Sequence, residues 1–377
     1  MGPLHGFRIV EIAGIGPGPF CGMLLADLGA DLICIQRPGG PEPDVAVPDR
    51  YNVLLRGRPS IEVDLKTPAG VDLVLKLCER ADALYEGFRP GVMEHLGLGP
   101  DACMGVNPKL IYGRVTGWGQ NGPLAQSAGH DGNYASIVGA IGAIGPADGP
   151  PTVPLNLVGD YGGGGAYLAI GILAALLEAE RSGKGQVVDA AMVDGAASLM
   201  SIFYGLHAGG LWRDSRGSNL LDGGAPFYRP YETKDGKFVF VAALEPKFYA
   251  QLLDGAGITA LDPAKQFDQS TWPAQEAALR KAFLSKNRDD WTAEFWETDA
   301  CVAPVLSISE APEHAHSRAR DAFVDVDGVV QPAPAPRFSR TPGQATGGGP
   351  TDRSGAADAL RTRGIPHADI DKIRGLQ

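Results

Sequence analysis

Short apolar runs alternate with helix-length apolar segments over the first third of the chain. The runs are rich in aliphatic and β-branched residues, and they predict strands at 7–12, 31–35, 83–85 and 110–112. Between them, segment 20–28 is apolar enough for a buried helix, and segment 68–82 carries apolar residues at helical spacing. Because strands that alternate with helices are typical of βαβ units, we expect an α/β fold with a parallel sheet.

The middle of the chain differs in composition, with many small residues and longer apolar segments. It predicts helices at 130–141, 165–180 and 192–210, with a strand at 186–190. Further on, two β-rich runs at 227–232 and 237–243 flank Lys234-Asp235-Gly236, and Asp-Gly between such runs is a hairpin signal. Helices are expected after the hairpin at 246–254, 273–284 and 288–297. The stretch 225–315 therefore predicts a second, smaller α+β domain.

The tail is rich in proline at 331–336 and in glycine at 343–350, which is typical of a linker or a surface crossing. Two helices, at 354–363 and 366–374, are expected to close the chain.

Charge and cysteine content exclude several classes of protein. Lysine and arginine number 33 against 44 acidic residues, a net charge of −11, which argues against general binding of nucleic acid. The five cysteines are scattered and form no CxxC pair, so neither a disulfide framework nor a zinc knuckle is indicated. The uncharged run 161–177 is shorter than the about 20 residues that span a bilayer and predicts a buried helix. No targeting segment is recognised, and we expect a cytoplasmic protein that does not bind a membrane.

The sequence does not indicate a metal or a redox cofactor. The loop Gly14–Pro19 follows the first strand as a dinucleotide loop would, but it is not GxGxxG, and its two prolines remove backbone donors. His314 and His316 could pair on a metal, but they sit among charged residues with no cysteine nearby. We therefore expect no metal site and no cofactor.

Three residues stand out as candidates for chemistry. His130 follows a glycine-dense loop and opens onto an apolar helix, where free backbone N–H groups attract negative charge. Asp160 precedes a run of four glycines, which would let a ligand approach a carboxylate closely. Glu245 ends a strand of the second domain. Taken alone, the pattern favours a loop or capping histidine, a helix-capping aspartate and a solvated glutamate.

Taken together, the chain resembles the family III CoA-transferase superfamily, and within it the α-methylacyl-CoA racemases. The resemblance covers roughly residues 3–341. Its motifs are weak singly and specific in this order and spacing: 14–19, 25–31, 56–58, 64–66, 86–92, 117–120, 129–131, 159–163, 183–186, 222–226 and 336–341. One departure is His95, where close racemases carry arginine, and this puts only a peripheral contact in question.

The resemblance implies an architecture. A large Rossmann-like domain would be built from both ends of the chain, with 1–200 as its first part and 316–377 as a return linker and its last part. Residues 201–224 would form a linker helix and loop, and 225–315 the small domain. It further implies an interlocked homodimer, in which the small domain of one subunit covers the large domain of the other and Glu245 reaches the His130/Asp160 site from the partner chain.

The resemblance also implies an activity and a set of roles. The racemase branch combines residues that match His130, Asp160 and Glu245, and it interconverts the enantiomers of 2-methylacyl-CoA thioesters by removing and returning the α-proton. We expect the backbone N–H of Asp131, and secondarily Tyr228, to stabilise the enolate, with Asn156 and Gly159 at the substrate. Four cations in matching segments are expected to contact the phosphates of CoA: Arg37, Arg56, Lys66 and Arg89.

Two alternatives remain open from the sequence. In the transferase branch, the residue that matches Asp160 is a nucleophile that carries CoA between carboxylic acids, and His130 would then be incidental. A non-catalytic acyl-CoA binder on the same fold is the second. The preferred acyl chain does not follow from the sequence, because apolar pockets discriminate weakly between chain lengths.

Overall fold

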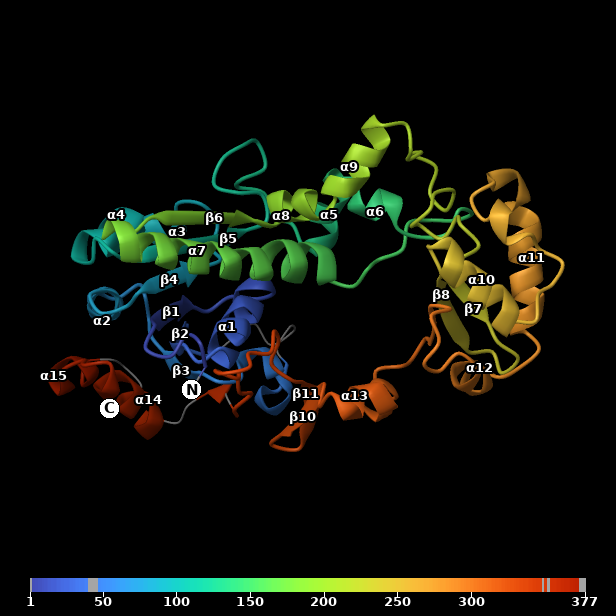
Figure 1. Ribbon diagram of the computed structural model, residues 1–377. Helices are drawn as coiled ribbons and strands as arrows, with labels where there is room; N and C mark the ends of the chain where they lie inside the picture. The colour runs from blue at the N-terminus through green and yellow to red at the C-terminus, as the bar shows by residue number, and fades with distance from the viewer. Residues whose placement is uncertain (1, 40–46, 348, 351–352, 373–377) are drawn as a thin grey trace. The chain divides into compact units, whose positions relative to one another are not determined.

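The computed structural model describes residues 2–39, 47–347, 349–350 and 353–372 (Figure 1). It divides into two compact units. Unit 1 comprises residues 1–138, 155–200 and 315–377, and unit 2 comprises 139–154 and 201–314. Residues 139–154, which the sequence placed in the large domain, therefore group with unit 2, as does the segment 201–224.

Unit 1 is built on a parallel sheet. Its strands are β1 (Arg8–Ile12), β2 (Asp31–Gln36), β3 (Pro59–Glu62), β4 (Ala83–Glu86), β5 (Ile111–Thr116) and β6 (Val187–Ala191), and a two-residue strand β12 (Gly349–Pro350) joins the edge. The order is β12-β3-β2-β1-β4-β5-β6, and every pair is parallel. The expected α/β fold with a parallel sheet is confirmed. Between β1 and β4 the strand order reverses, as it does in doubly wound nucleotide-binding folds.

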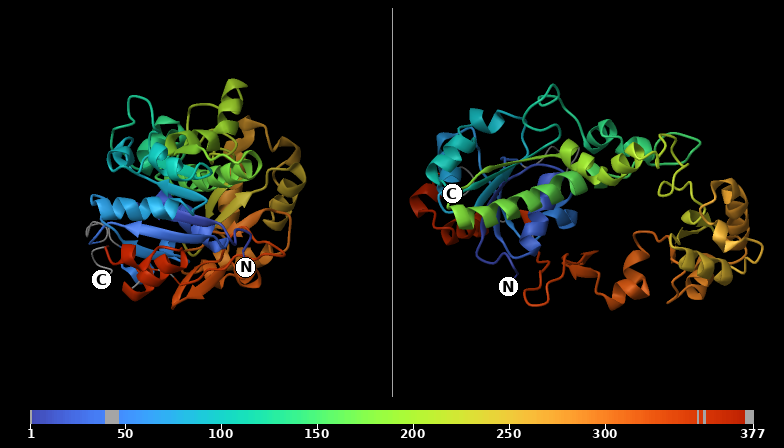
Figure 2. Two further views of the ribbon diagram at one scale, coloured as in Figure 1. Left: turned by 90° about the vertical axis from the view of Figure 1, so that its left-hand side faces the viewer. Right: turned by 45° about the horizontal axis from the view of Figure 1, so that its top comes forward.

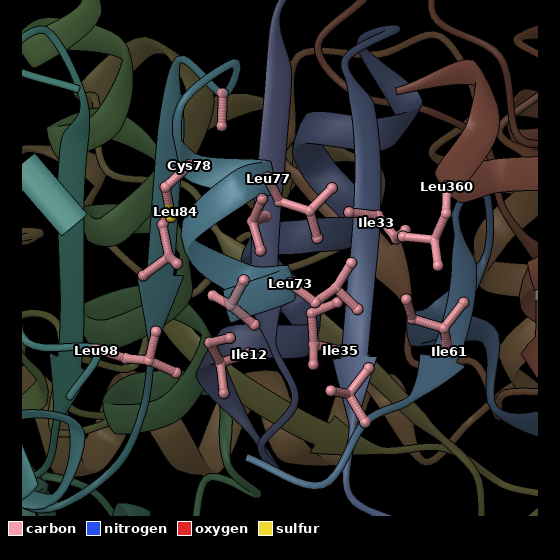
Figure 3. Packing of buried hydrophobic residues seen from close by; sticks show 14 of the residues in the cluster. Ile12, Ile33, Ile35, Ile61, Leu73, Leu77, Cys78, Leu84, Leu98 and Leu360 are labelled. Carbon is pink, nitrogen blue, oxygen red and sulfur yellow. The ribbon is translucent and has the colours of Figure 1, made fainter. Parts of the chain in front are cut away.

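One face of the sheet is covered by α2 (Pro68–Cys78), α4 (Pro100–Val106) and α14 (Arg353–Thr362). Helix α2 begins where Thr67 accepts a hydrogen bond from the N–H of Gly70 (3.1 Å) and Pro68 fills the first helical position. Leu73 and Leu77 of α2 then pack on Ile33 of the sheet (Figure 3). Successive strand residues alternate between the two faces, so this core is separate from the one behind it.

The other face is covered by α1 (Pro17–Asp27) and α7 (Tyr167–Ser182), which bury Leu25 and Ile172 against Ile9 and Ile111. Helix α7 runs along β5 and β6 (Figure 2). It continues a stretch of π-helix, η4 (Leu157–Ala166), and the combined helix is long and apolar enough to cross a membrane. Half of its most apolar part is buried inside the protein, however, which is typical of a core helix.

The remaining elements of unit 1 lie around this frame. They are the short turns η2 (Asp49–Tyr51) and η3 (Val53–Leu55), helices α3 (Val92–His95), α5 (Asp131–Ile137), α8 (Met192–Leu199), α13 (Ala315–Ala319) and α15 (His367–Ile370), and an antiparallel hairpin of β10 (Phe323–Val326) and β11 (Val329–Pro332).

Unit 2 is an α+β unit, as the sequence predicts for this region. Its sheet is β7 (Tyr228–Glu232), β8 (Phe238–Ala242) and β9 (Val302–Pro304), all antiparallel, and the β7–β8 hairpin turns at Gly236 with φ +72°. The helices and short turns are α6 (Ala140–Ala143), α9 (Ser201–Ala208), α10 (Pro246–Gly255), η5 (Pro263–Lys265), η6 (Gln269–Thr271), α11 (Trp272–Phe283), α12 (Arg288–Glu294) and η7 (Ala311–Glu313). An aromatic core that includes Phe227, Phe283 and Trp291 holds them together.

Two long helices of the sequence prediction are interrupted in the structure. The helix expected over 130–141 ends at Ile137 and resumes at Ala140, because Gly139 adopts φ +76°. The helix expected over 192–210 is likewise two helices, α8 and α9, with Met200 between them. The second break coincides with the boundary between the two units.

Candidate active site at the carboxyl edge of the sheet

Unit 1 contains a cleft of about 360 Å³ at the carboxyl ends of its central strands. The loops after β1, β4 and β5 line it with Gly14–Gly18, Gly87–Pro90 and Gly117–Trp118. In open α/β sheets, ligands bind where two neighbouring strands send their connections to opposite sides, and β1 and β4 are such a pair. The topology alone therefore identifies this edge as the place for a ligand.

His130 and Asp160 both line this cleft, although 30 positions separate them in the sequence. His130 immediately precedes α5, its ring is exposed, and its backbone N–H donates to Asn133 Oδ1 (3.0 Å). Asp160 is the fourth residue of η4 rather than a helix cap, and its side chain is half-buried. A π-helix is rare, and short π-helical stretches are often found at functional sites.

The Asp131 carboxylate connects the two elements. Asp131 is buried, and its Oδ2 accepts hydrogen bonds from the backbone N–H groups of Gly159 (2.6 Å) and Asp160 (2.7 Å). A Cβ at position 159 would fall 2.9 Å from this oxygen, so only glycine fits there. The start of α5, which carries His130, is thereby fixed to the segment that carries Asp160.

The surroundings of Asp160 favour its protonated form. Burial raises the pKa of its carboxyl above the ordinary value, and the neighbouring Asp131 adds to the effect. Asn156 Nδ2, which donates to Asp160 Oδ2 (3.2 Å), and His130 act in the opposite direction. On the far side, a Cβ on Gly16 would lie 2.9 Å from Asp160 Oδ2, and Gly16 itself has φ +70°. Glycine at position 16 is therefore required both by the backbone and by the carboxylate.

Two aromatic residues, Trp118 and Tyr134, line the cleft beside His130. The Tyr134 hydroxyl donates to the carbonyl oxygen of Gly129, and its ring meets Trp118 edge-on, with centroids 4.8 Å apart. Glycines at 117 and 129 make room for the Tyr134 ring. The glycine-dense loop of the sequence analysis thus surrounds a buried tyrosine on the approach to His130.

Glu86 stabilises the loop that follows β4 through a hydrogen bond and an ion pair. Its Oε2 accepts the N–H of Phe88 (2.6 Å), and its Oε1 lies 3.3 Å from Arg114 Nε. Arg114 also pairs with Glu94. Burial raises the pKa of Glu86 to about 7 despite this ion pair.

The raised pKa of Glu86 predicts a pH-dependent stability. Between pH 4.5 and about 7, the folded protein retains a proton on Glu86 that the unfolded chain has released. Stability then falls as the pH rises, and the free energy of unfolding of the wild type should decrease by about 3 kcal/mol relative to Glu86→Gln across this window. Urea unfolding of both proteins at pH 4.5 and pH 8 measures the difference, and a difference that does not change with pH would contradict it.

Three of the four cations assigned to CoA lie at the carboxyl edge of the sheet. Arg37 directly follows β2, Lys66 follows β3 and Arg89 follows β4, and all three are exposed. Arg89 also lines the cleft. Their positions are compatible with phosphate contacts.

Arg56 has a different environment and is unsuited to that role. It is 4% exposed and forms a two-pronged ion pair with Asp27 (Nε–Oδ1 2.9 Å, Nη2–Oδ2 2.5 Å). Its remaining Nη1 donates to Gln331 Oε1 and to the carbonyl oxygen of Pro332, both at 2.8 Å. The guanidinium is therefore committed to the interior, where it ties the end of α1 to β11.

Arg56→Met is accordingly expected to damage stability and leave CoA binding intact. The substitution leaves the buried Asp27 carboxylate without its ion-pair partner, which should lower the free energy of unfolding by about 3–5 kcal/mol. Chemical denaturation measures that loss, and calorimetry at low temperature measures CoA affinity of the folded protein. The double variant Arg56→Met/Asp27→Leu should recover much of the stability. If Arg56→Met is stable but binds CoA weakly, the expected contact between Arg56 and the phosphates of CoA would be supported instead.

Glu245 and Tyr228 belong to unit 2. Glu245 is exposed, directly precedes α10, and its carbonyl oxygen accepts the N–H groups of Phe248 and Tyr249. Tyr228 is the first residue of β7; it is half-buried, and its ring is edge-on to Phe240.

The described residues contain no group of three or more His, Cys, Asp or Glu side chains that could hold a metal ion.

Several residues of the site escaped the sequence analysis. The Asp131 carboxylate binds the backbone of η4, the Tyr134 ring meets Trp118, and Glu86 pairs with Arg114. Each of these contacts joins separate segments of the chain. Tyr134 stands four residues after His130, so helical spacing could have suggested that they share a face. For Asp131 and Glu86, one sequence carries no such signal.

Known proteins resemble this chain in sequence and in fold over most of its length. The family model of CoA-transferase family III matches residues 4–353. The α-methylacyl-CoA racemase of Mus musculus is 46% identical over 340 residues, which cover 90% of this chain and 87% of that protein. The racemase of Homo sapiens is 43% identical, with coverage of 90% and 87%. Among solved structures, a CAIB/BAIF family protein from Brucella suis superposes with a TM-score of 0.82 at 27% identity, over 96% of this chain and 99% of that one.

Proposed function

This chain belongs to CoA-transferase family III, and on that premise we propose that it is a racemase that interconverts (2R)- and (2S)-2-methylacyl-CoA thioesters. The observation that carries the proposal is the presence of an imidazole and a carboxyl in one cleft, held by separate elements that Asp131 joins. The similarity to two α-methylacyl-CoA racemases supports it.

The reaction requires a proton to leave one face of the α-carbon and another to arrive on the opposite face. For one enantiomer, neutral His130 takes the α-proton, the C–H electron pair moves into the thioester to form an enolate, and protonated Asp160 returns a proton to the other face. For the other enantiomer, the Asp160 carboxylate takes the proton and the His130 imidazolium returns one. The two starting forms of the enzyme carry the same number of protons and differ only in which of the two residues holds one of them.

The environment of Asp160 suits this use. A carboxyl with an ordinary pKa gives up its proton too readily to be a good acid at neutral pH, and a raised pKa brings it closer to the working range. Partial burial supplies that shift, while access to the cleft keeps the group in reach of the substrate. The enolate oxygen also needs a donor, and Asp131 offers one: as the first residue of α5, its N–H has no acceptor within the helix.

The test is proton NMR of a single enantiomer of a 2-methylacyl-CoA, incubated with the enzyme in D₂O. Loss of the α-proton signal, collapse of the methyl doublet and the appearance of both epimers are the expected results. An unchanged spectrum over several acyl chain lengths would reject the racemase. Transfer of CoA from an acyl-CoA to an added carboxylate, with an acyl-enzyme that hydroxylamine traps on Asp160, would instead establish the transferase chemistry.

We further propose that the working form is a homodimer whose sites are shared. Large apolar side chains are exposed on helices of the single chain, including Ile170 and Leu177 of α7 in unit 1 and Ile202 and Tyr204 of α9 in unit 2. Exposed apolar side chains on one helix face, such as Ile170 and Leu177 seven positions apart on α7, are typical of protein interfaces. In this arrangement Glu245 of one subunit accepts a hydrogen bond from the His130 ring of the other and fixes its tautomer.

Subunit mixing tests the shared site. His130→Gln and Glu245→Gln homodimers should both be poorly active, because every site carries a defect. In a mixed dimer one site carries both defects and the other carries none, so random exchange should restore roughly a quarter of wild-type activity. Refolding of the two variants together, with differently tagged subunits, measures this. Mixed dimers that form and stay inactive would place Glu245 and His130 of each site in the same chain.

A further inference from the structure

Three polar side chains are buried beside the cleft, in the middle of the sheet. Glu11 of β1, Arg58 just before β3 and Tyr85 of β4 are 0%, 2% and 0% exposed. Arg58 Nε lies 2.6 Å from Glu11 Oε2, and Arg58 Nη2 lies 3.4 Å from Oε1. A Cβ on Gly22 of α1 would fall 2.4 Å from the Tyr85 hydroxyl and 2.8 Å from Arg58 Cζ, so both groups fill the space that this glycine leaves.

Stability alone does not account for such a cluster. Removing two charges from water costs several kcal/mol each, and well-packed apolar residues of similar volume are often as stable or more stable than a buried ion pair. The neighbouring strand positions Ile9, Ile33 and Leu84 are buried and apolar. A buried charge pair in this setting therefore calls for a role that apolar side chains could not fill.

The cluster contacts the first turn of α1, which forms one wall of the cleft. Arg58 Nη2 donates to the carbonyl oxygen of Pro19 (3.1 Å), and the Tyr85 ring itself lines the cleft. Residues 16–18, which lead into this turn, line the cleft as well. Only a group with several fixed donors, such as guanidinium, can hold both a carboxylate and a main-chain carbonyl in this geometry.

The same turn lies directly against Asp160. A Cβ on Gly16 would be 2.9 Å from Asp160 Oδ2, and a Cβ on Gly165 would be 2.6 Å from the carbonyl oxygen of Pro17. Helix α1 and η4 are thus closely packed: the Pro17 backbone approaches Gly165, and the Phe20 ring of α1 stacks on the Tyr161 ring of η4 with centroids 4.7 Å apart. A shift of the turn would move directly into the space of the carboxylate or open it to water.

We propose that Glu11, Arg58 and Tyr85 are positioning residues that hold the turn at Gly16–Pro19 against Asp160 and thereby control the position and hydration of its carboxyl. This inference rests on the proposed function of Asp160 as an acid–base group. In this proposal the cluster acts on Asp160 through the backbone of α1.

The other groups around Asp160 are fixed by separate contacts. Helix α1 carries no charged side chain before Asp27, and the one titratable side chain of α8, Asp194, is exposed. Helix α7 contributes Tyr167, whose hydroxyl donates to Ser198 Oγ (2.6 Å). The titratable groups that face the carboxyl are those of the α5 region: His130, Asp131 and Tyr134. Within the described part of the chain, no hydrogen bond or ion pair joins these three residues to Glu11, Arg58 or Tyr85. The cluster is therefore linked to Asp160 through the turn at Gly16–Pro19.

A second buried ion pair provides a matched control. Asp27 and Arg56 join the opposite end of α1 to β11, and neither residue lines the cleft. Glu11→Gln and Asp27→Asn each replace one buried carboxylate by an amide of the same shape, and each leaves an arginine without its charge partner. Both variants should lose stability, and only Glu11→Gln should alter Asp160.

The experiment combines kinetics with a direct reading of Asp160. Carboxyl ¹³C NMR of aspartate-labelled protein, with the Asp160 signal assigned from Asp160→Asn, follows its titration without substrate. In Glu11→Gln we expect the pKa of Asp160 to fall towards the ordinary value as the turn relaxes, and kcat to fall at least about tenfold with KM within twofold. In Asp27→Asn, the titration and kcat of the folded protein should match the wild type.

Two milder variants cover the case in which Glu11→Gln does not fold. Tyr85→Phe removes one hydroxyl, and Arg58→Lys keeps the charge but loses the fork that reaches Pro19. Each should shift the Asp160 titration in the same direction by a smaller amount. If the folded variants of the cluster and Asp27→Asn lose stability in parallel and leave the Asp160 titration unchanged, the cluster is structural only and the proposal is overturned.

The readouts also separate this proposal from the proposed function. If the wild type shows no exchange of the α-proton in D₂O, the racemase fails, whatever the variants do. The titration of Asp160 is read in the free enzyme, so it still decides whether the cluster positions that carboxyl.

Discussion

Replacing His130 with glutamine is expected to abolish interconversion of the two enantiomers, with kcat lowered by about 10³-fold or more. Glutamine keeps a similar length and polarity but neither accepts nor delivers a proton at neutral pH. Both directions of the reaction should fail, because the proposed mechanism uses His130 as the base for one enantiomer and as the acid for the other. Racemisation is followed by polarimetry or chiral chromatography of the hydrolysed product.

A more specific consequence concerns deuterium exchange. In His130→Gln, the Asp160 carboxylate can still remove the α-proton of one enantiomer and return a deuteron from the same face. That enantiomer should exchange its α-proton in D₂O without inversion, while the other should not exchange at all. Retained racemisation would remove His130 from the mechanism, and unchanged CoA transfer in the variant would point to the transferase alternative.

The control for His130→Gln is the same substitution at His5. His5 is exposed and precedes β1, at the amino edge of the sheet, opposite the cleft. His5→Gln should match the wild type in stability, CoA affinity and rate. It separates the loss of an imidazole in the cleft from a general effect of the substitution on the protein.

The fold follows from the sequence where local pattern and tertiary role agree. The strands β1, β2 and β4 are mostly apolar because both faces of the sheet are covered, and such runs are recognisable without knowledge of their neighbours. Strand β3 was missed, because its four residues begin with proline and include Ser60 and Glu62. The β10–β11 hairpin was also missed, although Asp327-Gly328 at its turn is the signal that identified the β7–β8 hairpin; its strands are only four residues long and border the proline-rich stretch 331–336.

The site is less predictable, because its chemistry depends on contacts between distant segments. Arg56 and Arg89 are alike in sequence terms, each in a short motif with glycine nearby. One is buried against Asp27 and the other is exposed at the cleft, and the difference comes from which strand edge each occupies. Likewise, the sequence assigned only the backbone of Asp131 a role, whereas its side chain joins the segments that carry His130 and Asp160. A single sequence does not contain these pairings.

Asp160→Asn is expected to produce a loss as large as that of His130→Gln, with the opposite pattern of exchange. Asparagine has the same shape and can still accept from Asn156, but it neither removes nor returns a proton. Racemisation should fall about 10³-fold or more. Exchange without inversion should persist only for the enantiomer that His130 deprotonates. Asp194→Asn, an exposed site on α8, is the matched control and should retain full activity.

The stability of Asp160→Asn gives a second, independent reading of the same residue. Because the pKa of Asp160 is raised in the folded protein, ionisation of this carboxyl works against folding once the pH exceeds its ordinary value. The neutral amide escapes that cost, so the variant should be at least as stable as the wild type at pH 7, with the advantage disappearing below about pH 4. Urea unfolding at both pH values measures this. An inactive enzyme that is more stable than the active one would show that the carboxyl is kept for chemistry at the expense of stability, whereas a destabilised variant would assign Asp160 a structural role in η4.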